Sequence, residues 1–270
     1  MKRLELWVGA VLVAGVVAMA LVSFVWTPFD PTAVRSAEPL LRPGWPHALG
    51  TDHMGIDTFS RLLVGARSAL YVGVIAVGIA ALVGVPLGIA AAWLPRLPAE
   101  IVMRATDVAY AFPALLLAIL LAGVFGASTE TAMVAIGVAT IPQFLRVTRA
   151  GALSVLASDY VLAARACGTR LPAIAGRHVL PNVAPLIGVQ ASVSFAMAIL
   201  AEAALSYLGL GTPPTVPSWG RMLGDAQTYL FSHPVQAVWP GLAIAGAVLG
   251  FNLVGDGLRD FLDPKLQEVA

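Results

Sequence analysis

Residues 7–25 read WVGAVLVAGVVAMALVSFV, a run of 19 apolar or small residues without a charge. A helix needs about 20 such residues to cross the roughly 30 Å hydrocarbon core of a bilayer. The rest of the chain has the same character, because 59% of its 270 residues are hydrophobic and only 11% are charged. An average soluble domain carries about 25% charged residues. The sequence therefore predicts an integral membrane protein of the all-α class.

Long uncharged stretches predict where the chain crosses the membrane. Most of them contain 22 to 30 residues between successive charges, but only 15 residues separate Glu130 from Arg146. The fourth span should therefore place Glu130 at an interface. Within a single domain covering residues 1–270, we expect six spans at about 7–26, 69–94, 106–125, 129–147, 184–205 and 236–256.

The first span has an alternative interpretation. Lys2 and Arg3, followed by an apolar run that contains Ala18-Met19-Ala20, would also suit a cleaved signal peptide. The apolar region of a secretory signal is usually about 7–15 residues long. The run here is longer, which favours a membrane anchor.

The distribution of lysine and arginine predicts the orientation. With the N-terminus inside, eleven of the sixteen basic residues fall in inner segments and five in outer segments. Cytoplasmic loops carry an excess of these residues. We therefore expect a multi-pass protein with both termini in the cytoplasm.

Two outer segments interrupt the simple bundle. The first is a loop at 27–68, and the second, at 206–235, contains the sequence GLGTPPTVP at 209–217. Its prolines lack backbone donors and clash with a preceding helical turn, so this stretch should be irregular. Irregular backbone near a membrane is tolerated where protein or water satisfies its polar groups, which suits the outer mouth of a pathway.

The inner loop at 147–182 is too long for a simple connection between helices. Ser158 and Asp159 are candidate N-caps for a short helix that ends before Gly168, a residue suited to a left-handed C-cap. Pro172 suits the first turn of a second short helix running to about Val179, which Leu180-Pro181 would end. The loop is therefore predicted to form a helix, a sharp turn and a helix.

The first of these short helices should be amphipathic. Tyr160, Val161, Ala164 and Cys167 share one face at helical spacing, and arginines flank it. Such a helix either rests on its own membrane surface or inserts into a cytoplasmic partner.

The spacing of Ala163-Ala164, Gly168 and Leu180-Pro181 resembles the coupling loop of ABC importer permeases. Leu162 replaces the usual Glu of that pattern, and His178 replaces the usual Ile. The sequence RHVLPN at 177–182 is similar to the peptide-transporter branch of the family.

Two further stretches extend the resemblance over nearly the whole chain. LGTDHMGIDTFSR at 49–61 and EAALSYLGLGTPPTVPSWG at 202–220 are similar to outer segments of the C-type permease of dipeptide and oligopeptide importers. Arg104, Asp107 and Phe112-Pro113 also match the pattern of the C-type permease. Ile56 stands where these proteins usually carry Arg.

The resemblance implies a type I ABC importer permease fold, with a coupling-helix loop, in a bacterial inner membrane. It implies three kinds of partner: a second homologous permease, two ATPase subunits and an extracytoplasmic binding protein. ATP and Mg would be bound by the ATPase subunits. This chain itself would bind no cofactor or metal and catalyse nothing. The substrate stays open between dipeptides, oligopeptides, nickel, glutathione and haem. The implied coupling residues are Asp159, Tyr160, Ala163, Ala164, Arg165, Gly168, Arg177, His178, Leu180 and Pro181.

Few polar residues lie inside the predicted spans. Gln190 and Ser194 share a helical face and, with Asn252, either line a pathway or form interhelical contacts. Glu202 and Trp219 are candidates for an outer gate or for a structural role. Asp107 is expected to pair with Arg104 at i, i+3 spacing.

Two other classes of membrane protein compete with an importer permease. Ion-driven secondary transporters place acidic residues or broken helices at mid-membrane, but every acidic residue here can be placed at or beyond an interface. Intramembrane peptidases are disfavoured, since the four histidines fall in predicted loops and neither HExxH nor GxSxG occurs. The net charge of +1 gives no basic patch for nucleic acid, and one cysteine excludes a disulfide framework.

Overall fold

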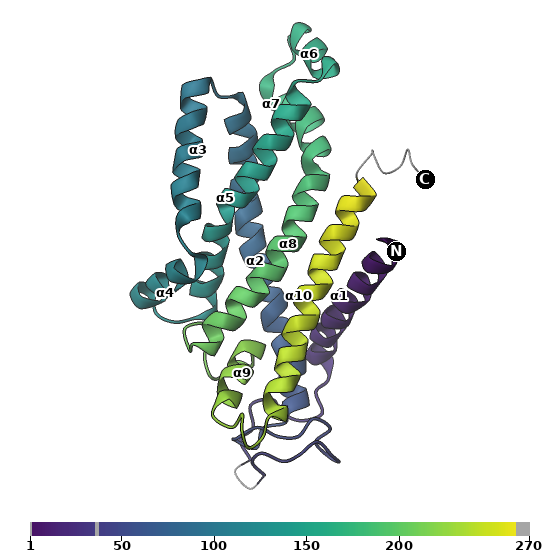
Figure 1. Ribbon diagram of the computed structural model, residues 1–270, viewed down its shortest axis with the longest axis vertical. Coiled ribbons are helices and arrows are strands. Elements are labelled where there is room, and N and C mark those ends of the chain that lie inside the picture. Colours follow the sequence, from purple (N-terminus) through teal and green to yellow (C-terminus); the bar gives the residue numbers. More distant parts are fainter. Residues whose placement is uncertain (1, 36–37, 263–270) are drawn as a thin grey trace.

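The computed structural model describes residues 2–35 and 38–262, which form an elongated helical bundle (Figure 1). The described residues contain no β-strand, in agreement with the all-α class. The elements in chain order are α1 (Lys2–Val25), α2 (Thr58–Trp93), α3 (Arg96–Ala111), α4 (Ala114–Phe125), α5 (Thr129–Leu156), α6 (Asp159–Ala166), α7 (Leu171–Ile174), the π-helix η1 (Ala175–Val179), α8 (Leu180–Tyr207), α9 (Trp219–Gln227) and α10 (Val235–Leu262).

Five helices of the described chain are long and apolar enough to cross a membrane. A sixth span is obtained if α3 and α4 are taken together, although these two helices are bent by 77° relative to each other. The expected set of six spans is therefore present, with the third one broken. The five continuous candidates are Leu4–Val25, Thr58–Trp93, Thr129–Leu156, Leu171–Tyr207 and Val235–Phe261.

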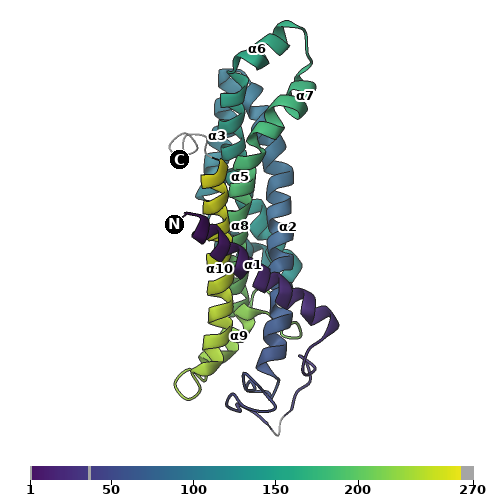
Figure 2. The same cartoon turned by 90° about the vertical axis from the view of Figure 1, so that its right-hand side faces the viewer.

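Helix α2 lies at the centre of the bundle, against α5 and α8, while α1 crosses α10 and α2 obliquely (Figure 2). The α2–α5 contact is close because Gly84 faces Phe144, which is fully buried. A Cβ atom at position 84 would lie only 2.6 Å from the Cβ of Phe144. Small residues let membrane helices approach in this way.

The second span begins at Thr58, eleven residues earlier than the sequence predicted. The prediction started the span after Arg67, because arginine is costly inside a membrane. Both arginines in the first turns have partners, however: Arg61 pairs with Asp52 and Asp225, and Arg67 bonds to Ser23. The expected outer loop 27–68 therefore ends at residue 57.

The third and fourth spans also differ from their expected form. Phe112 is extended (φ −77°, ψ 119°) because the following Pro113 disfavours helical backbone before it, so the predicted helix 106–125 is broken there. The expected pair Asp107–Arg104 is wrong: Asp107 accepts a hydrogen bond of 2.6 Å from Arg146 of α5. Helix α5 continues past its predicted end at residue 147 to Leu156.

The outer segment 206–235 is less irregular than expected. Its proline-rich part has no helix, but α9 follows directly, capped by Ser218, whose hydroxyl accepts from the backbone N–H of Arg221 at 3.1 Å. Trp219 is 1% exposed and donates from Nε1 to the carbonyl oxygen of Leu62 at 2.9 Å. This tryptophan therefore fixes α9 against α2.

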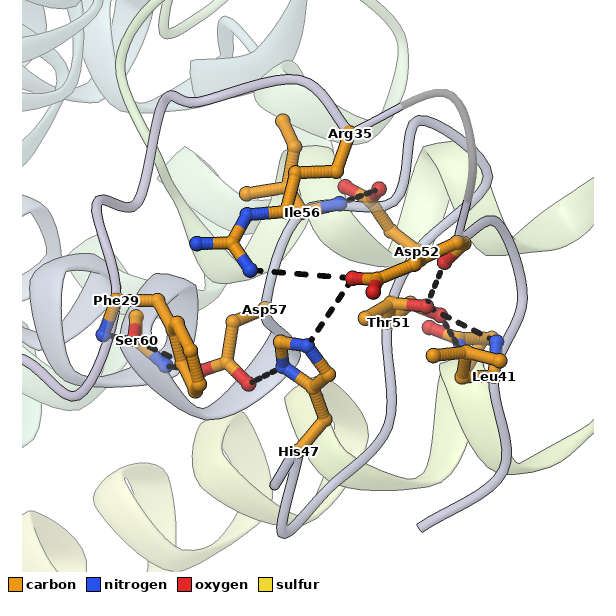
Figure 3. A network of polar contacts seen from close by, with 11 residues as sticks. Phe29, Arg35, Leu41, His47, Thr51, Asp52, Ile56, Asp57 and Ser60 are labelled. Atoms are coloured by element: carbon orange, nitrogen blue, oxygen red, sulfur yellow. Dashed lines mark hydrogen bonds and ion pairs between the residues drawn. The ribbon is translucent and has the colours of Figure 1, made fainter. Parts of the chain in front are cut away.

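The connection between α1 and α2 forms a compact layer that we call the loop cap (residues 26–35 and 38–57). Figure 3 shows its polar network. Buried His47 lies 2.8 Å from Asp57, which also caps α2 by accepting from the N–H and hydroxyl of Ser60. Thr51 donates to the carbonyl of Glu38 and accepts from Leu41. Side chains, rather than regular secondary structure, therefore hold the loop cap together.

Candidate functional site

The end of the bundle opposite the loop cap carries residues 157–182, which we call the projecting segment. It contains α6, α7, η1 and the first three residues of α8, and α6 projects beyond the end of α5 (Figures 1 and 2). It begins later than the expected loop at 147 because α5 is longer than predicted.

The turn after α6 is built as the sequence predicted. Ser158 occupies the N-cap position, although its hydroxyl donates to the carbonyl of Val155 and does not cap α6. Gly168 has a φ of +78°, in the left-handed region. The N–H of Thr169 donates to the carbonyl of Ala164 and the N–H of Gly168 donates to that of Arg165, at 3.1 and 2.9 Å. These two bonds form a Schellman motif. Glycine adopts its backbone conformation without the penalty that a side chain would bring.

The second short helix does not end at Leu180-Pro181, and this expectation is wrong. Helix α7 starts at Leu171 with Pro172 in its first turn, passes through η1 and continues as α8. The N–H of Leu180 donates to the carbonyl of Ala175, five residues back. Proline is tolerated at the start of a helix, so Pro181 marks the first turn of α8 rather than a break.

An apolar cluster joins the projecting segment to the bundle. Its central members have no exposed surface: Val161 from α6, Ile174 from α7, Val179 from η1 and Val183 from the start of α8. Of the predicted apolar face of α6, Val161 is therefore buried against its own chain, while Tyr160 and Cys167 are exposed. For Val161 this replaces both expected alternatives, the membrane surface and a cytoplasmic partner. The opposite side exposes Leu162, Ala163, Ala166 and Cys167.

A second contact ties α6 to the beginning of α8. The ring of Tyr160 meets His178 edge-on, with centroids 5.8 Å apart. Asn182 donates to the Tyr160 hydroxyl at 3.3 Å and to the carbonyl of His178 at 2.7 Å. Asn182 was not among the predicted site residues, although it closes the RHVLPN sequence on which the resemblance rests.

The charged residues of the projecting segment, and most of the other predicted coupling residues, are exposed on its surface. Asp159, Arg165, Arg170 and Arg177 are exposed, and none of them forms an ion pair within the described ranges 2–35 and 38–262. Leu180 is 42% exposed. Of the predicted coupling residues, Ala164 is half-buried and Gly168 and Pro181 are exposed. The surface therefore combines exposed apolar groups with unpaired positive charge.

The predicted pathway residues have internal partners in this chain. Gln190 of α8 donates to Gln143 of α5 at 3.1 Å and to Ser194 at 2.9 Å. Asn252 donates to the carbonyl of Val248, one turn back on α10. The partly buried Gln143–Gln190 contact links two spans, as interhelical hydrogen bonds do in membrane proteins.

Glu202 lies near the C-terminal end of α8 and is 2% exposed. Its Oε1 accepts hydrogen bonds from the hydroxyls of Ser206 and Thr212 at 2.6 and 3.0 Å. The N–H of Thr212 in turn donates to the hydroxyl of Ser206 at 2.9 Å. The carboxylate thus holds the proline-rich stretch against the end of its own helix.

Comparison with known proteins identifies the class. Residues 84–268 match the family described as "Binding-protein-dependent transport system inner membrane component". The dipeptide transport system permease protein DppC of Escherichia coli (strain K12) is 41% identical over 269 residues, covering 95% of this chain and 89% of the relative. The chain belongs to this family.

Other relatives and a solved structure agree with that membership. DppC of Alkalihalophilus pseudofirmus is 38% identical, covering 96% of this permease component and 86% of the relative. The di/tripeptide transport system permease protein DppC of Pseudomonas aeruginosa is 41% identical, covering 90% of this chain and 82% of the relative. A chain of the MetNI methionine ABC transporter, in an inward-facing conformation, has a TM-score of 0.60 at 15% identity over 78% of this chain and 96% of that one. The expected ABC importer permease fold is confirmed, and the chain is a transport component of an importer, not an enzyme.

Proposed function

We propose that this permease component forms half of the translocation pathway of an ATP-driven importer for dipeptides or oligopeptides. The substrate class is supported by three relatives that are named as dipeptide or di/tripeptide permeases. They are 38–41% identical to this chain over at least nine-tenths of its length. A relative named as a glutathione permease, GsiD of Pectobacterium atrosepticum, is 40% identical over 83% of the chain, so a peptide-like thiol is the competing substrate.

The proposed assembly has four further subunits. A second, homologous permease completes the pathway, and two ATPase subunits hold ATP and Mg on the cytoplasmic side. A binding protein on the opposite side delivers the peptide. The family description, which specifies a binding-protein-dependent system and an inner membrane component, supports this arrangement.

In the proposed orientation the projecting segment and both termini are cytoplasmic. Two observations support it. Eleven of sixteen basic residues fall in the segments that this orientation places inside. The described start of α1 and the end of α10 also point toward the end of the bundle from which α6 projects (Figure 1).

The projecting segment is proposed as the site where the ATPase subunits contact the permease and transmit their conformational change to it. The exposed side of α6 would dock on the ATPase, with Asp159, Ala163 and Arg165 at the contact. Because Val161 of α6 packs with Val183 of α8 in one buried cluster, a displacement of α6 would be transmitted directly to α8. Gly168, Arg177, His178, Leu180 and Pro181 would set the angle between the docking helix and α8.

The polar residues of α8 and α10 are proposed to face the pathway when the second permease is present. Gln190, Ser194 and Asn252 would exchange their present bonds for contacts to water or substrate in part of the cycle. Glu202 and Trp219 would anchor the outer end, since both are already fixed by hydrogen bonds to neighbouring segments.

Uptake of a labelled peptide tests the proposal. The complete importer would be reconstituted in vesicles with ATP and its binding protein, and accumulation of a radiolabelled dipeptide would be compared with that of glutathione. ATP-dependent dipeptide uptake that requires this chain is expected. ATP-dependent uptake of glutathione without dipeptide uptake would contradict the substrate class, and uptake driven by an ion gradient without ATP would contradict the mechanism.

A further inference from the structure

A groove of about 510 Å³ runs between the second half of α1 and the first half of α2. Its lining is mostly apolar and includes Val17, Leu21, Phe24, Tyr71 and Val74, with the guanidinium of Arg67 among them. Leu21, Tyr71 and Val74 are 62%, 54% and 60% exposed. Because both helices are candidate membrane spans, the groove opens toward the hydrocarbon region rather than toward water.

Arg67 has a charge without a carboxylate partner. Its Nε donates to the hydroxyl of Ser23, and its guanidinium carbon lies 3.9 Å from the centre of the Phe24 ring. In the described part of the chain, no carboxylate oxygen lies within 4 Å of its nitrogens, and its guanidinium makes no other hydrogen bond. An arginine carries five N–H donors, so most of this group stays available.

A second arginine on α2, unlike Arg67, has carboxylate partners. Arg61, six residues earlier, lies between the carboxylates of Asp52 and Asp225 and is 6% exposed. Arg67 sits deeper along α2, among apolar side chains, with only a hydroxyl and a ring as neighbours. A charged group in this setting is expected to find an anion.

Arg67 lies toward the loop-cap ends of α1 and α2, where we expect the lipid headgroups. It lies nine residues after the start of α2, about 14 Å along the helix, and its partner Ser23 is two residues from the end of α1, about 3 Å. Tyr71 follows one turn, or about 6 Å, further toward the middle of the membrane on the same face of α2. The order along the groove is therefore cation, phenolic hydroxyl and then aliphatic side chains.

We propose that this groove binds one anionic glycerophospholipid of the leaflet on the side of the loop cap. The planar guanidinium of Arg67 donates to the phosphate in the two-pronged manner that arginine favours. The Tyr71 hydroxyl donates to an ester carbonyl, and an acyl chain packs over Leu21 and Val74. At the level of the headgroups, a phospholipid supplies its phosphate without any further protein segment reaching the groove.

Native mass spectrometry of the assembled importer in detergent tests the proposal, with phosphatidylglycerol and phosphatidylcholine as the two probes. The wild type is expected to retain one phosphatidylglycerol under conditions that strip phosphatidylcholine. Arg67→Gln should weaken retention at least about tenfold, because both charge-assisted hydrogen bonds to the phosphate are lost. Arg104→Gln, at an exposed position on α3, is the matched control and should bind as the wild type does.

A second variant keeps the test decisive if Arg67→Gln does not assemble. Leu21→Trp fills the groove and should displace the lipid, whereas Leu120→Trp, at a 57% exposed position of α4, should not. Equal retention of both probes, or unchanged phosphatidylglycerol in Arg67→Gln or Leu21→Trp, would overturn the proposal. So would a disulfide or bifunctional crosslink from Leu21→Cys to the second permease, because that subunit would then occupy the groove.

Discussion

The loop cap and the projecting segment lie at opposite ends of the bundle and are held together by different forces. The loop cap buries charged and polar groups against one another, as in the Arg61–Asp52 and His47–Asp57 pairs. The projecting segment is held by an apolar cluster on its inner side and leaves its arginines exposed and unpaired within the described residues. The loop cap therefore pairs its main charged groups internally, while the projecting segment leaves its arginines available for a proposed partner.

This difference has an energetic consequence. Removing one member of a buried ion pair leaves an uncompensated charge, whereas removing an exposed charge has little effect on stability. Substitutions in the loop cap should therefore act mainly on folding. Substitutions on the exposed side of the projecting segment should act mainly on assembly and transport.

The largest effect is expected for Arg61→Met. It leaves the carboxylates of Asp52 and Asp225 without their shared cation, and the free energy of unfolding should fall by about 3–5 kcal/mol. Thermal unfolding of the purified permease in detergent measures this. The control, Arg96→Met, removes a pair with Glu100 in which the arginine side chain is 90% exposed, so it should change stability by less than about 1 kcal/mol. Equal losses in the two variants would remove the distinction between buried and exposed charge.

A smaller effect is expected for Val161→Ala in α6. The side chain has no exposed surface and joins α6 to α8, so its truncation should destabilise the segment by about 2 kcal/mol. The neighbouring Leu162→Ala, at a 49% exposed position, should leave stability within about 0.5 kcal/mol but reduce co-purification of the ATPase subunits. The reverse pattern would mean that the docking face of α6 has been assigned to the wrong side.

Gly168→Ala should have a still smaller effect on stability, about 1–2 kcal/mol, because alanine is strained at a φ of +78°. The turn angle between α6 and α7 should shift, and ATP-dependent uptake should fall more than stability does. Gly176→Ala is the matched control, since that glycine is helical and a Cβ there would meet nothing within 4 Å. If the two variants transported equally well, the left-handed turn would not matter for coupling.

The smallest effect is expected for Tyr160→Phe. It deletes the hydroxyl that accepts a 3.3 Å hydrogen bond from Asn182 and keeps the ring that meets His178. Because the residue is 49% exposed, water replaces the lost bond, and the free energy of unfolding should change by about 0.5 kcal/mol or less. Chemical denaturation measured by tryptophan fluorescence gives the value. A loss of several kcal/mol would show that this contact, rather than the apolar cluster, holds the segment.

The sequence predicted the features that depend on local patterns. Uncharged stretches located the spans, and the Ser158 N-cap and the Gly168 turn were predicted from residue preferences alone. For Glu202 the sequence left an outer gate and a structural role open, and in the structure its carboxylate accepts a hydrogen bond from Thr212 of the proline-rich stretch.

The features that depend on distant partners could not be predicted. The start of α2 was misplaced because nothing in a local window shows that Asp225, 164 residues away, helps to neutralise Arg61. The partner of Asp107 was missed for the same reason, since Arg146 lies 39 residues along the chain. The inward face of α6 could not be recognised because helical spacing identifies an apolar face without showing what covers it.

The central claim is that the exposed side of the projecting segment docks on the ATPase subunits, and Cys167 tests it most directly. This cysteine is exposed next to the Gly168 turn, and it is the only cysteine in the chain. A membrane-impermeant maleimide should label it in inside-out vesicles that lack the ATPase subunits, and not in intact spheroplasts. Co-assembled ATPase subunits should protect it, with a denatured sample as the control for total thiol. Labelling in spheroplasts, or labelling in inside-out vesicles that the ATPase subunits leave unchanged, would contradict the account.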